Sequence, residues 1–276
     1  MLTPDSLIVR LTDAEPYTLA GLRGLGIAIG LLLATWVVYR SRTLAAWRSL
    51  SPTMLFGALV NGLGNMLFVV ALELTNVANV LIALAVEPLF AALMSRLMLG
   101  ERVSRATAWA MIGGFAGIVI VVGDSLGEAR LWGDLAALAC SLCFAYFMVL
   151  LRKAGDVDST PAVGVSGFFT ALLALPLVFL TGEGTAAILS LDAAQWGWIV
   201  LGSLVVLPLS FGLISIGPRY LPAAEVSLLI LLEAVLGPFW VWLVLDEHPT
   251  TAALIGGVVV LATLALHSLW GLRRQR

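Results

Sequence analysis

Nine apolar stretches of about 20 residues follow one another along the chain, with only short polar connections between them. About 20 residues is the length that a helix needs to cross the hydrocarbon core of a bilayer. The stretches are rich in Leu, Ala, Val and Gly and lack the alternation of a barrel strand, so they predict membrane-spanning helices. They cover residues 17–39, 53–73, 77–99, 105–123, 131–151, 161–180, 195–216, 223–245 and 250–270.

An internal repeat accounts for the first twelve residues, which are apolar but too short to span a bilayer. A shift of 146 positions places Glu87 on Glu233 and Glu101 on Glu247. The second half begins its five spans at residue 131, so the same shift would start the first half before residue 1. The chain is therefore predicted to be an all-α membrane protein of ten transmembrane helices with a shortened first helix. The two five-helix repeats are expected at residues 1–125 and 126–276.

The repeats are expected to be inverted, because each contains an odd number of helices. Basic residues set the orientation of the whole chain, since cytoplasmic loops are enriched in Lys and Arg. With both termini in the cytoplasm, only Arg10 and Arg130 face outward. The inner segments then hold Arg40, Arg42, Arg48, Arg102, Arg105, Arg152, Lys153, Arg219, Arg273, Arg274 and Arg276. We therefore expect a multi-pass protein of the cytoplasmic (inner) membrane with both termini inside.

Composition supports a bilayer environment and excludes several classes of function. Only 12% of the residues are charged, against about a quarter in soluble domains. There is no basic stripe for a nucleic acid, and nothing resembles a phosphate-binding loop, so we expect no nucleic-acid partner and no cofactor. Cys140 and Cys143 lie within an apolar helix without a second ligand pair, so no metal site is expected. The expected partners are a small-molecule substrate and the lipid bilayer, and the expected state is a monomer or a weak homodimer.

Two related motifs carry a family resemblance. Glu87-Pro88 is followed by an apolar run that ends in Leu99-Gly100-Glu101, and then by a Gly-rich helix. In the second half the counterparts are Glu233-Ala234 and Leu245-Asp246-Glu247. The chain resembles the ten-helix EamA-type branch of the drug/metabolite transporter superfamily along nearly its whole length. The resemblance implies export or exchange of small metabolites, often amino acids and in some members aromatic ones.

Two acidic residues at mid-span are the first candidates for a substrate or proton site. Glu87 and Glu233 are both about 15 Å deep by helix rise, a depth at which an ionisable residue faces a cavity or a partner. On one continuous helix, Asn76, Asn79 and Glu87 would share a stripe with Ala83. The alternative is that the two acids are protonated and hydrogen-bond neighbouring helices as structural contacts.

Other positions have both a functional and a structural interpretation. Asn61, Asn65 and Tyr146 are candidates for substrate contact, with interhelical packing as the alternative. Pro88, Pro208 and Pro238 interrupt spans and are candidate kinks or gates, with a static bend as the alternative.

For several charged residues and the two histidines we favour a structural role. Arg23 is expected near the outer end of its helix with its charge reaching the interface. Glu101 and Glu247 are expected to support the helices that follow them, next to the caps Ser104 and Thr250. His248 and His267 are expected at opposite faces.

The function predicted is a secondary transporter, not an enzyme, that exports or exchanges amino acids by alternating access between the inverted halves. An intramembrane lipid-modifying enzyme is the alternative from another class. A carrier of the same family for sugars or nucleotides is the alternative within the class.

Overall fold

A computed structural model of the chain describes residues 5–40, 50–101, 104–154, 160–180, 184–210 and 236–275. Its elements are helices throughout these ranges. They are α1 (Asp5–Thr12), α2 (Pro16–Tyr39), α4 (Pro52–Leu74), α5 (Val77–Ala85), α6 (Glu87–Leu99), α7 (Arg105–Asp124), α8 (Arg130–Ala154), α9 (Thr160–Leu180), α10 (Gly184–Leu189), α11 (Ala193–Val200), the π-helical η2 (Leu201–Val206), a helix at Leu236–Leu245 and α14 (Thr251–Gln275).

Eight of the described helical segments are long and apolar enough to cross a membrane. Their bounds agree with eight of the nine predicted spans to within a few residues because prolines and caps mark the starts, except that residues 211–216 of one span and 223–235 of the ninth lie outside the described residues. Pro16 and Pro52 stand in the first turns of α2 and α4, where a missing N–H costs nothing. The Ser51 hydroxyl accepts a hydrogen bond from the Met54 amide at 3.2 Å. Within the described residues the first helix is α1, with eight residues, in agreement with a shortened first helix.

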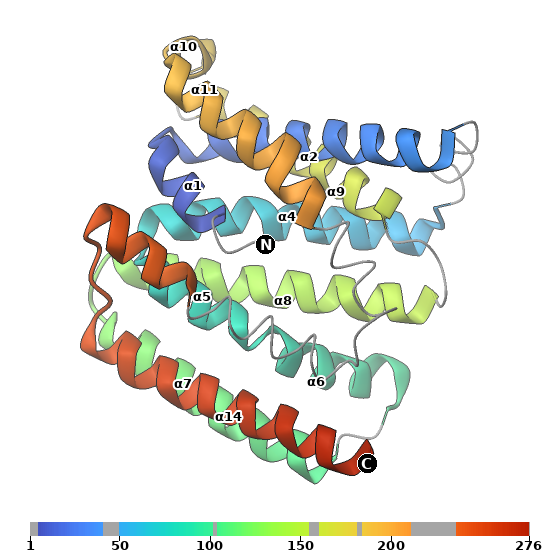
Figure 1. Cartoon of the computed structure of the whole chain (residues 1–276), viewed down its shortest axis with the longest axis vertical. Coiled ribbons are helices and arrows are strands. Elements are labelled where there is room, and N and C mark those ends of the chain that lie inside the picture. Colours follow the sequence, from blue (N-terminus) through green and yellow to red (C-terminus); the bar gives the residue numbers. More distant parts are fainter. Residues whose placement is uncertain are drawn as a thin grey trace.

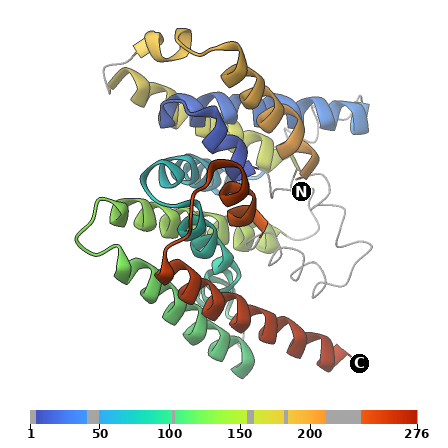
Figure 2. The ribbon, with the colours of Figure 1, turned by 60° about the vertical axis from the view of Figure 1, so that its left-hand side comes forward.

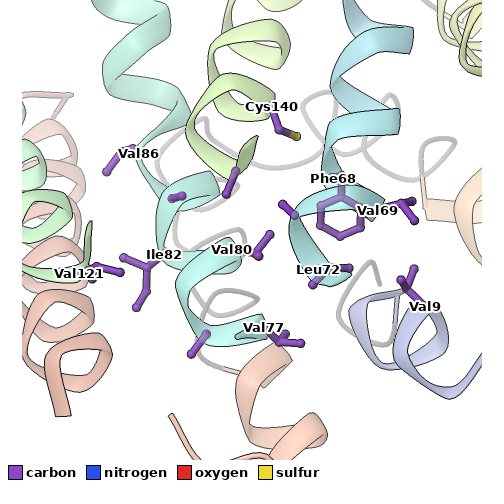
Figure 3. Close-up of a cluster of buried hydrophobic side chains, with 14 of the residues drawn as sticks. Val9, Phe68, Val69, Leu72, Val77, Val80, Ile82, Val86, Val121 and Cys140 are labelled. Carbon is purple, nitrogen blue, oxygen red and sulfur yellow. The ribbon is translucent and has the colours of Figure 1, made fainter. Parts of the chain in front are cut away.

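The helices form three groups across the bundle. Figures 1 and 2 show α7 and α14 side by side at one edge, α2 with α9 and α11 at the opposite edge, and α4, α5 and α8 between them. The main apolar core lies in the middle group. Figure 3 shows Phe68 and Leu72 of α4, Val80 of α5 and Cys140 of α8 in this core, with Val9 of α1 beside them.

Helices that occupy the same place in the two repeats pack against each other in opposite directions. Along α2 and α9, Gly21 faces Leu175, Gly24 faces Ala171, and Gly167 faces Ala28. The numbers rise on one helix as they fall on the other, so the two counterparts are antiparallel. α7 and α14 behave in the same way, because Gly113 faces Thr263.

Gly117 continues that antiparallel register by facing Gly256. The two repeats are therefore inverted, as predicted.

Glycine permits the close approach at both crossings. A Cβ built on Gly24 would lie 2.6 Å from the carbonyl oxygen of Gly167, and one built on Gly167 would lie 2.6 Å from that of Gly24. In the same way, a Cβ built on Gly117 would lie 2.8 Å from the carbonyl oxygen of Gly256, and one built on Gly256 would lie 2.6 Å from that of Gly117. Small residues at crossings let membrane helices touch along their backbones. These contacts mark the axis that relates the halves.

Candidate functional site

Glu87 lies at a break in the fourth span rather than inside a continuous helix. α5 ends at Ala85, Val86 forms a turn with φ −86° and ψ 0°, and α6 begins at Glu87 with Pro88 in its first turn. The predicted stripe from Asn76 to Glu87 assumed one straight helix, and the break corrects it, because Pro88 cannot donate a hydrogen bond to the Leu84 carbonyl. Glu87 is half-buried. No hydrogen bond joins the Glu87 carboxylate to another of the described residues.

Asn79 belongs to a buried polar cluster between α5 and α8. Its amide nitrogen is 3.0 Å from Oδ1 of Asp134 and 3.4 Å from the Thr75 hydroxyl. Thr75 itself donates to the same Asp134 oxygen at 2.7 Å. All three residues are buried. In this conformation Asn79 therefore joins helices, while Asn76 is half-buried at the N-cap position of α5 without a capping bond from its side chain.

Glu247 closes the same end of the bundle by binding two elements of the first repeat. Its Oε1 accepts a hydrogen bond from the Val77 amide, in the first turn of α5, at 2.8 Å. Its Oε2 is 3.3 Å from Nη2 of Arg10, and that nitrogen also donates to the Thr75 carbonyl at 3.0 Å. Glu247 was expected to support the helix that follows it, but it instead neutralises the N-terminus of α5. We call this end, with Arg10, Thr75 and Glu247, the Arg10 end.

The repeat-equivalent carboxylate, Glu101, makes a simpler contact at the opposite end. Its Oε2 is 3.3 Å from Nη1 of Arg152, near the C-terminus of α8. The geometry repeats that of the first pair, since α1 and α8 are the first helices of their repeats and each binds the loop carboxylate of the other half. We call this end, with Glu101 and Arg152, the Arg152 end.

The expected caps lie at both ends. The Ser104 hydroxyl accepts from the Thr107 amide at 3.0 Å, and the Thr250 hydroxyl accepts from the Ala253 amide at 3.0 Å. His267 contacts the Thr107 hydroxyl at 3.1 Å, whereas His248 pairs with Asp246 at 3.3 Å. The two histidines thus serve different ends.

The remaining polar candidates lie in helix contacts. Asn61 donates to the Ser166 hydroxyl of α9 at 2.8 Å and is buried. Asn65, one turn further along α4, is half-buried. Tyr146 is half-buried and packs edge-on against Phe56, with 6.1 Å between ring centroids.

Pro208 and Pro238 are placed differently, and Glu233 lies outside the described residues. Pro208 follows η2, in which the Leu207 amide bonds to the carbonyl of Gly202, five residues earlier. This π-type turn is a known way of fitting an irregularity into a membrane helix. Pro208 packs on Gly30 of α2. Pro238 is half-buried in the helix at Leu236–Leu245.

Arg23 corrects an expectation, because it is buried and paired instead of reaching the interface. Its Nη2 is 2.8 Å from both carboxylate oxygens of Asp5, in the first turn of α1. The Phe68 ring lies against the guanidinium, with 5.7 Å from Cζ to the centroid. Sequence reasoning missed Asp5 and Asp134. A signal was available for Asp134, which is an acidic residue inside the predicted span 131–151.

Side chains of the types that can bind a metal ion lie apart from one another in the described residues. Cys140 is a buried free thiol and Cys143 a half-buried one. Within the described ranges, no group of three or more His, Cys, Asp or Glu residues is assembled for a metal ion.

Comparisons with known proteins agree with this architecture. The model of the EamA-like transporter family matches the chain twice, at residues 7–123 and 131–269. A solved structure titled "Crystal structure of protein" is similar in fold, with a TM-score of 0.70 and 20% sequence identity over 97% of this chain and 93% of that chain. No curated protein matches the chain. Members of the matched family carry small molecules across membranes. The two family matches cover both halves, so this multi-pass membrane protein belongs to the EamA-like transporter family of the drug/metabolite transporter superfamily.

Proposed function

We propose that the protein is a secondary carrier that exports or exchanges amino acids, aromatic ones included, by alternating access. The observation that carries the proposal is the antiparallel packing of counterpart helices at Gly24 with Gly167 and at Gly117 with Gly256. Inverted repeats give a carrier two equivalent but oppositely facing ways to pack around one site. Rocking one repeat against the other about these contacts exchanges the two packings. The driving force is a gradient of substrate or protons, and no cofactor takes part.

Glu87 is proposed to bind the substrate amine or a coupling proton. Three features support this role: its depth in the span, its half-buried position and its place at the break before Pro88. A carboxylate at this depth is expensive unless it faces a cavity or a partner. Glu233 is its proposed counterpart in the second repeat. Pro88, Pro208 and Pro238 are the proposed flexible points.

The Arg10 end is proposed to face outward and the Arg152 end the cytoplasm. This places both termini inside and follows the distribution of basic residues, since translocating clustered cations is resisted. In this orientation the described conformation is held at its outer end by Glu247 and Arg10. The carrier is proposed to work as a monomer or a weak homodimer in the cytoplasmic membrane.

Counterflow in proteoliposomes tests the proposal. Vesicles loaded with unlabelled compound are diluted into a trace of the same compound in labelled form, using amino acids, sugars and nucleotides in turn. We expect transient accumulation of amino acids that the Glu87→Gln variant loses or performs without dependence on pH. The matched control is Glu73→Gln, because Glu73 is an exposed acid at the end of α4. Normal counterflow with an unchanged pH profile in Glu87→Gln would overturn the role of Glu87.

The same experiment separates the alternative functions. Accumulation of only sugars or nucleotides would keep the carrier and replace the substrate class. Absence of counterflow for every compound, together with turnover of a lipid by the solubilised protein, would favour the intramembrane enzyme.

A further inference from the structure

The ion pair of Arg23 and Asp5 joins α2 to α1, next to the contact at which α2 crosses its counterpart α9. Arg23 precedes Gly24, at which α2 crosses its counterpart α9. Asp5 is in the first turn of α1, and the following residue, Ser6, is close to Gly237 of the second repeat. Each side chain is only 9% exposed. A buried charge pair in this position is expensive to form, since both ions give up their water.

The guanidinium of Arg23 is not fully used by Asp5. Both contacts to the carboxylate come from Nη2, at 2.8 Å each. The Nε nitrogen is buried and has no hydrogen-bond partner. Arginine recognises a carboxylate best as a fork, with two parallel N–H donors on two oxygens. Asp5 is therefore a partial match for Arg23, and the side of the guanidinium that carries Nε is unmatched.

An aromatic ring completes the surroundings. Phe68 lies against the guanidinium and is itself buried in the main core, between α4 and α1 (Figure 3). The site thus combines a buried cation, a carboxylate that uses only one of its nitrogens, and an apolar aromatic ring. An amino acid with an aromatic side chain has the chemistry that fits all three.

We infer that Arg23 binds the carboxylate of the transported amino acid, and that Asp5 occupies this position while the substrate is absent. The inference rests on the proposed function and adds to it a residue for the substrate carboxylate. Asp5 is suited to leave, since it lies in the first turn of an eight-residue helix. The substrate carboxylate would accept one hydrogen bond from Nε and one from Nη2. These two parallel bonds would replace the two that Asp5 now accepts from Nη2 alone.

The competing interpretation is a structural pair that only fixes α1 to α2. In that case neither residue would affect which part of a substrate is recognised. The two interpretations differ in their consequences for Asp5. If Asp5 competes with the substrate, removing its charge tightens substrate binding, whereas a purely structural pair gives no gain.

The test is competition against phenylalanine counterflow in proteoliposomes by two analogues. Phenethylamine lacks the carboxylate, and 3-phenylpropionate lacks the amine. In the wild-type protein we expect phenethylamine to compete at least tenfold more weakly than unlabelled phenylalanine. In Arg23→Gln the half-saturation concentration of phenylalanine should rise on the order of 10- to 100-fold while that of phenethylamine is unchanged, as loss of charged hydrogen bonds predicts. For Arg23→Lys, the half-saturation concentration of phenylalanine should fall between those of the wild-type protein and Arg23→Gln.

Asp5→Asn supplies the decisive comparison. We expect it to lower the half-saturation concentration of phenylalanine several-fold. Arg130→Gln is the matched control, because Arg130 also pairs with acids but does so at the Arg10 end, where it contacts Glu128 and Asp124. Arg130→Gln should leave the half-saturation concentrations of phenylalanine, phenethylamine and 3-phenylpropionate unchanged. Size-exclusion profiles of the detergent-solubilised variants show which of them fold, and Arg23→Lys and Asp5→Asn keep the test valid if Arg23→Gln does not.

Two results would contradict the inference in distinguishable ways. Equal weakening of phenylalanine and phenethylamine in the Arg23 variants, with no gain in Asp5→Asn, would leave a structural pair in a working amino acid carrier. Absence of phenylalanine counterflow in the wild-type protein, with every other amino acid also inactive, would remove the proposed substrate class and this inference with it.

Discussion

The Arg10 end and the Arg152 end are built from repeat-equivalent carboxylates, but among the described residues the carboxylate of the Arg10 end binds more partners. At the Arg10 end, Glu247 holds Arg10 and the Val77 amide, with both partners of the ion pair about one-quarter exposed. At the Arg152 end, Glu101 meets an Arg152 side chain that is 66% exposed. The same motif therefore makes a network at one end and a surface ion pair at the other. The difference shows that a repeat can conserve a position while the conformation decides how much it contributes to stability.

Reversing the charge of Arg10 should have the largest effect on this comparison. In Arg10→Glu the new carboxylate would face Glu247 and the Thr75 carbonyl, so two charge-assisted bonds become repulsive contacts. We expect the free energy of unfolding in detergent to fall by about 3 kcal/mol or more, from the loss of charged hydrogen bonds. Thermal unfolding followed by size exclusion measures it. An unchanged unfolding profile would mean that the Arg10 end is not held by this cation.

Glu247→Ala should have the second-largest effect on the free energy of unfolding. It removes both the ion pair and the bond to the Val77 amide, at an expected cost of about 1.5–3 kcal/mol. A double-mutant cycle with Arg10→Ala separates the coupling between the two side chains from their other contacts. A coupling indistinguishable from zero would assign the role of Glu247 to α5 alone.

Asp134→Asn should be milder, because an amide oxygen can still accept the bonds that Thr75 and Asn79 donate. The expected loss is about 1 kcal/mol, the size of one ordinary hydrogen bond. The control is Asp124→Asn at the same end, where the exposed carboxylate pairs with Arg130. A larger loss in Asp124→Asn than in Asp134→Asn would contradict the importance assigned to the buried cluster.

Glu101→Ala should have the smallest effect. An exposed ion pair contributes about 0–1 kcal/mol and is screened by salt. We expect little change in unfolding at low ionic strength and none at high ionic strength. A loss as large as that of Glu247→Ala would show that the two ends are equally closed.

The architecture could be predicted from the sequence because membrane helices depend on local features. Apolar length fixed the spans, Pro16 and Pro52 marked helix starts, and the spacing between Glu87 and Glu233 revealed the repeat. The break before Glu87 was less visible. Pro88 predicts a kink, but a helical wheel assumes a straight helix, and the predicted polar stripe inherited that assumption.

The partners within the site could not be predicted, because they come from helices distant in sequence. Nothing local to Arg23 identifies Asp5, 18 positions earlier, as its partner, and the apolar sequence around Arg23 fitted an interfacial side chain equally well. Glu247 looked like support for the next helix. Its actual partner is the Val77 amide, 170 positions away in the other repeat. Such contacts depend on how the two halves pack.

Distances measured at both ends of the molecule test the central claim, alternating access between inverted halves, most directly. In a background with Cys140 and Cys143 replaced by Ala, one spin-label pair is placed at Leu126 and Leu189 near the Arg10 end. A second pair, in a separate protein, is placed at Leu97 and Leu269 near the Arg152 end. All four positions are exposed. With saturating phenylalanine, electron resonance distances should change in opposite directions, one pair separating as the other approaches. Distances that stay fixed at both ends, or change in the same direction, would contradict the account.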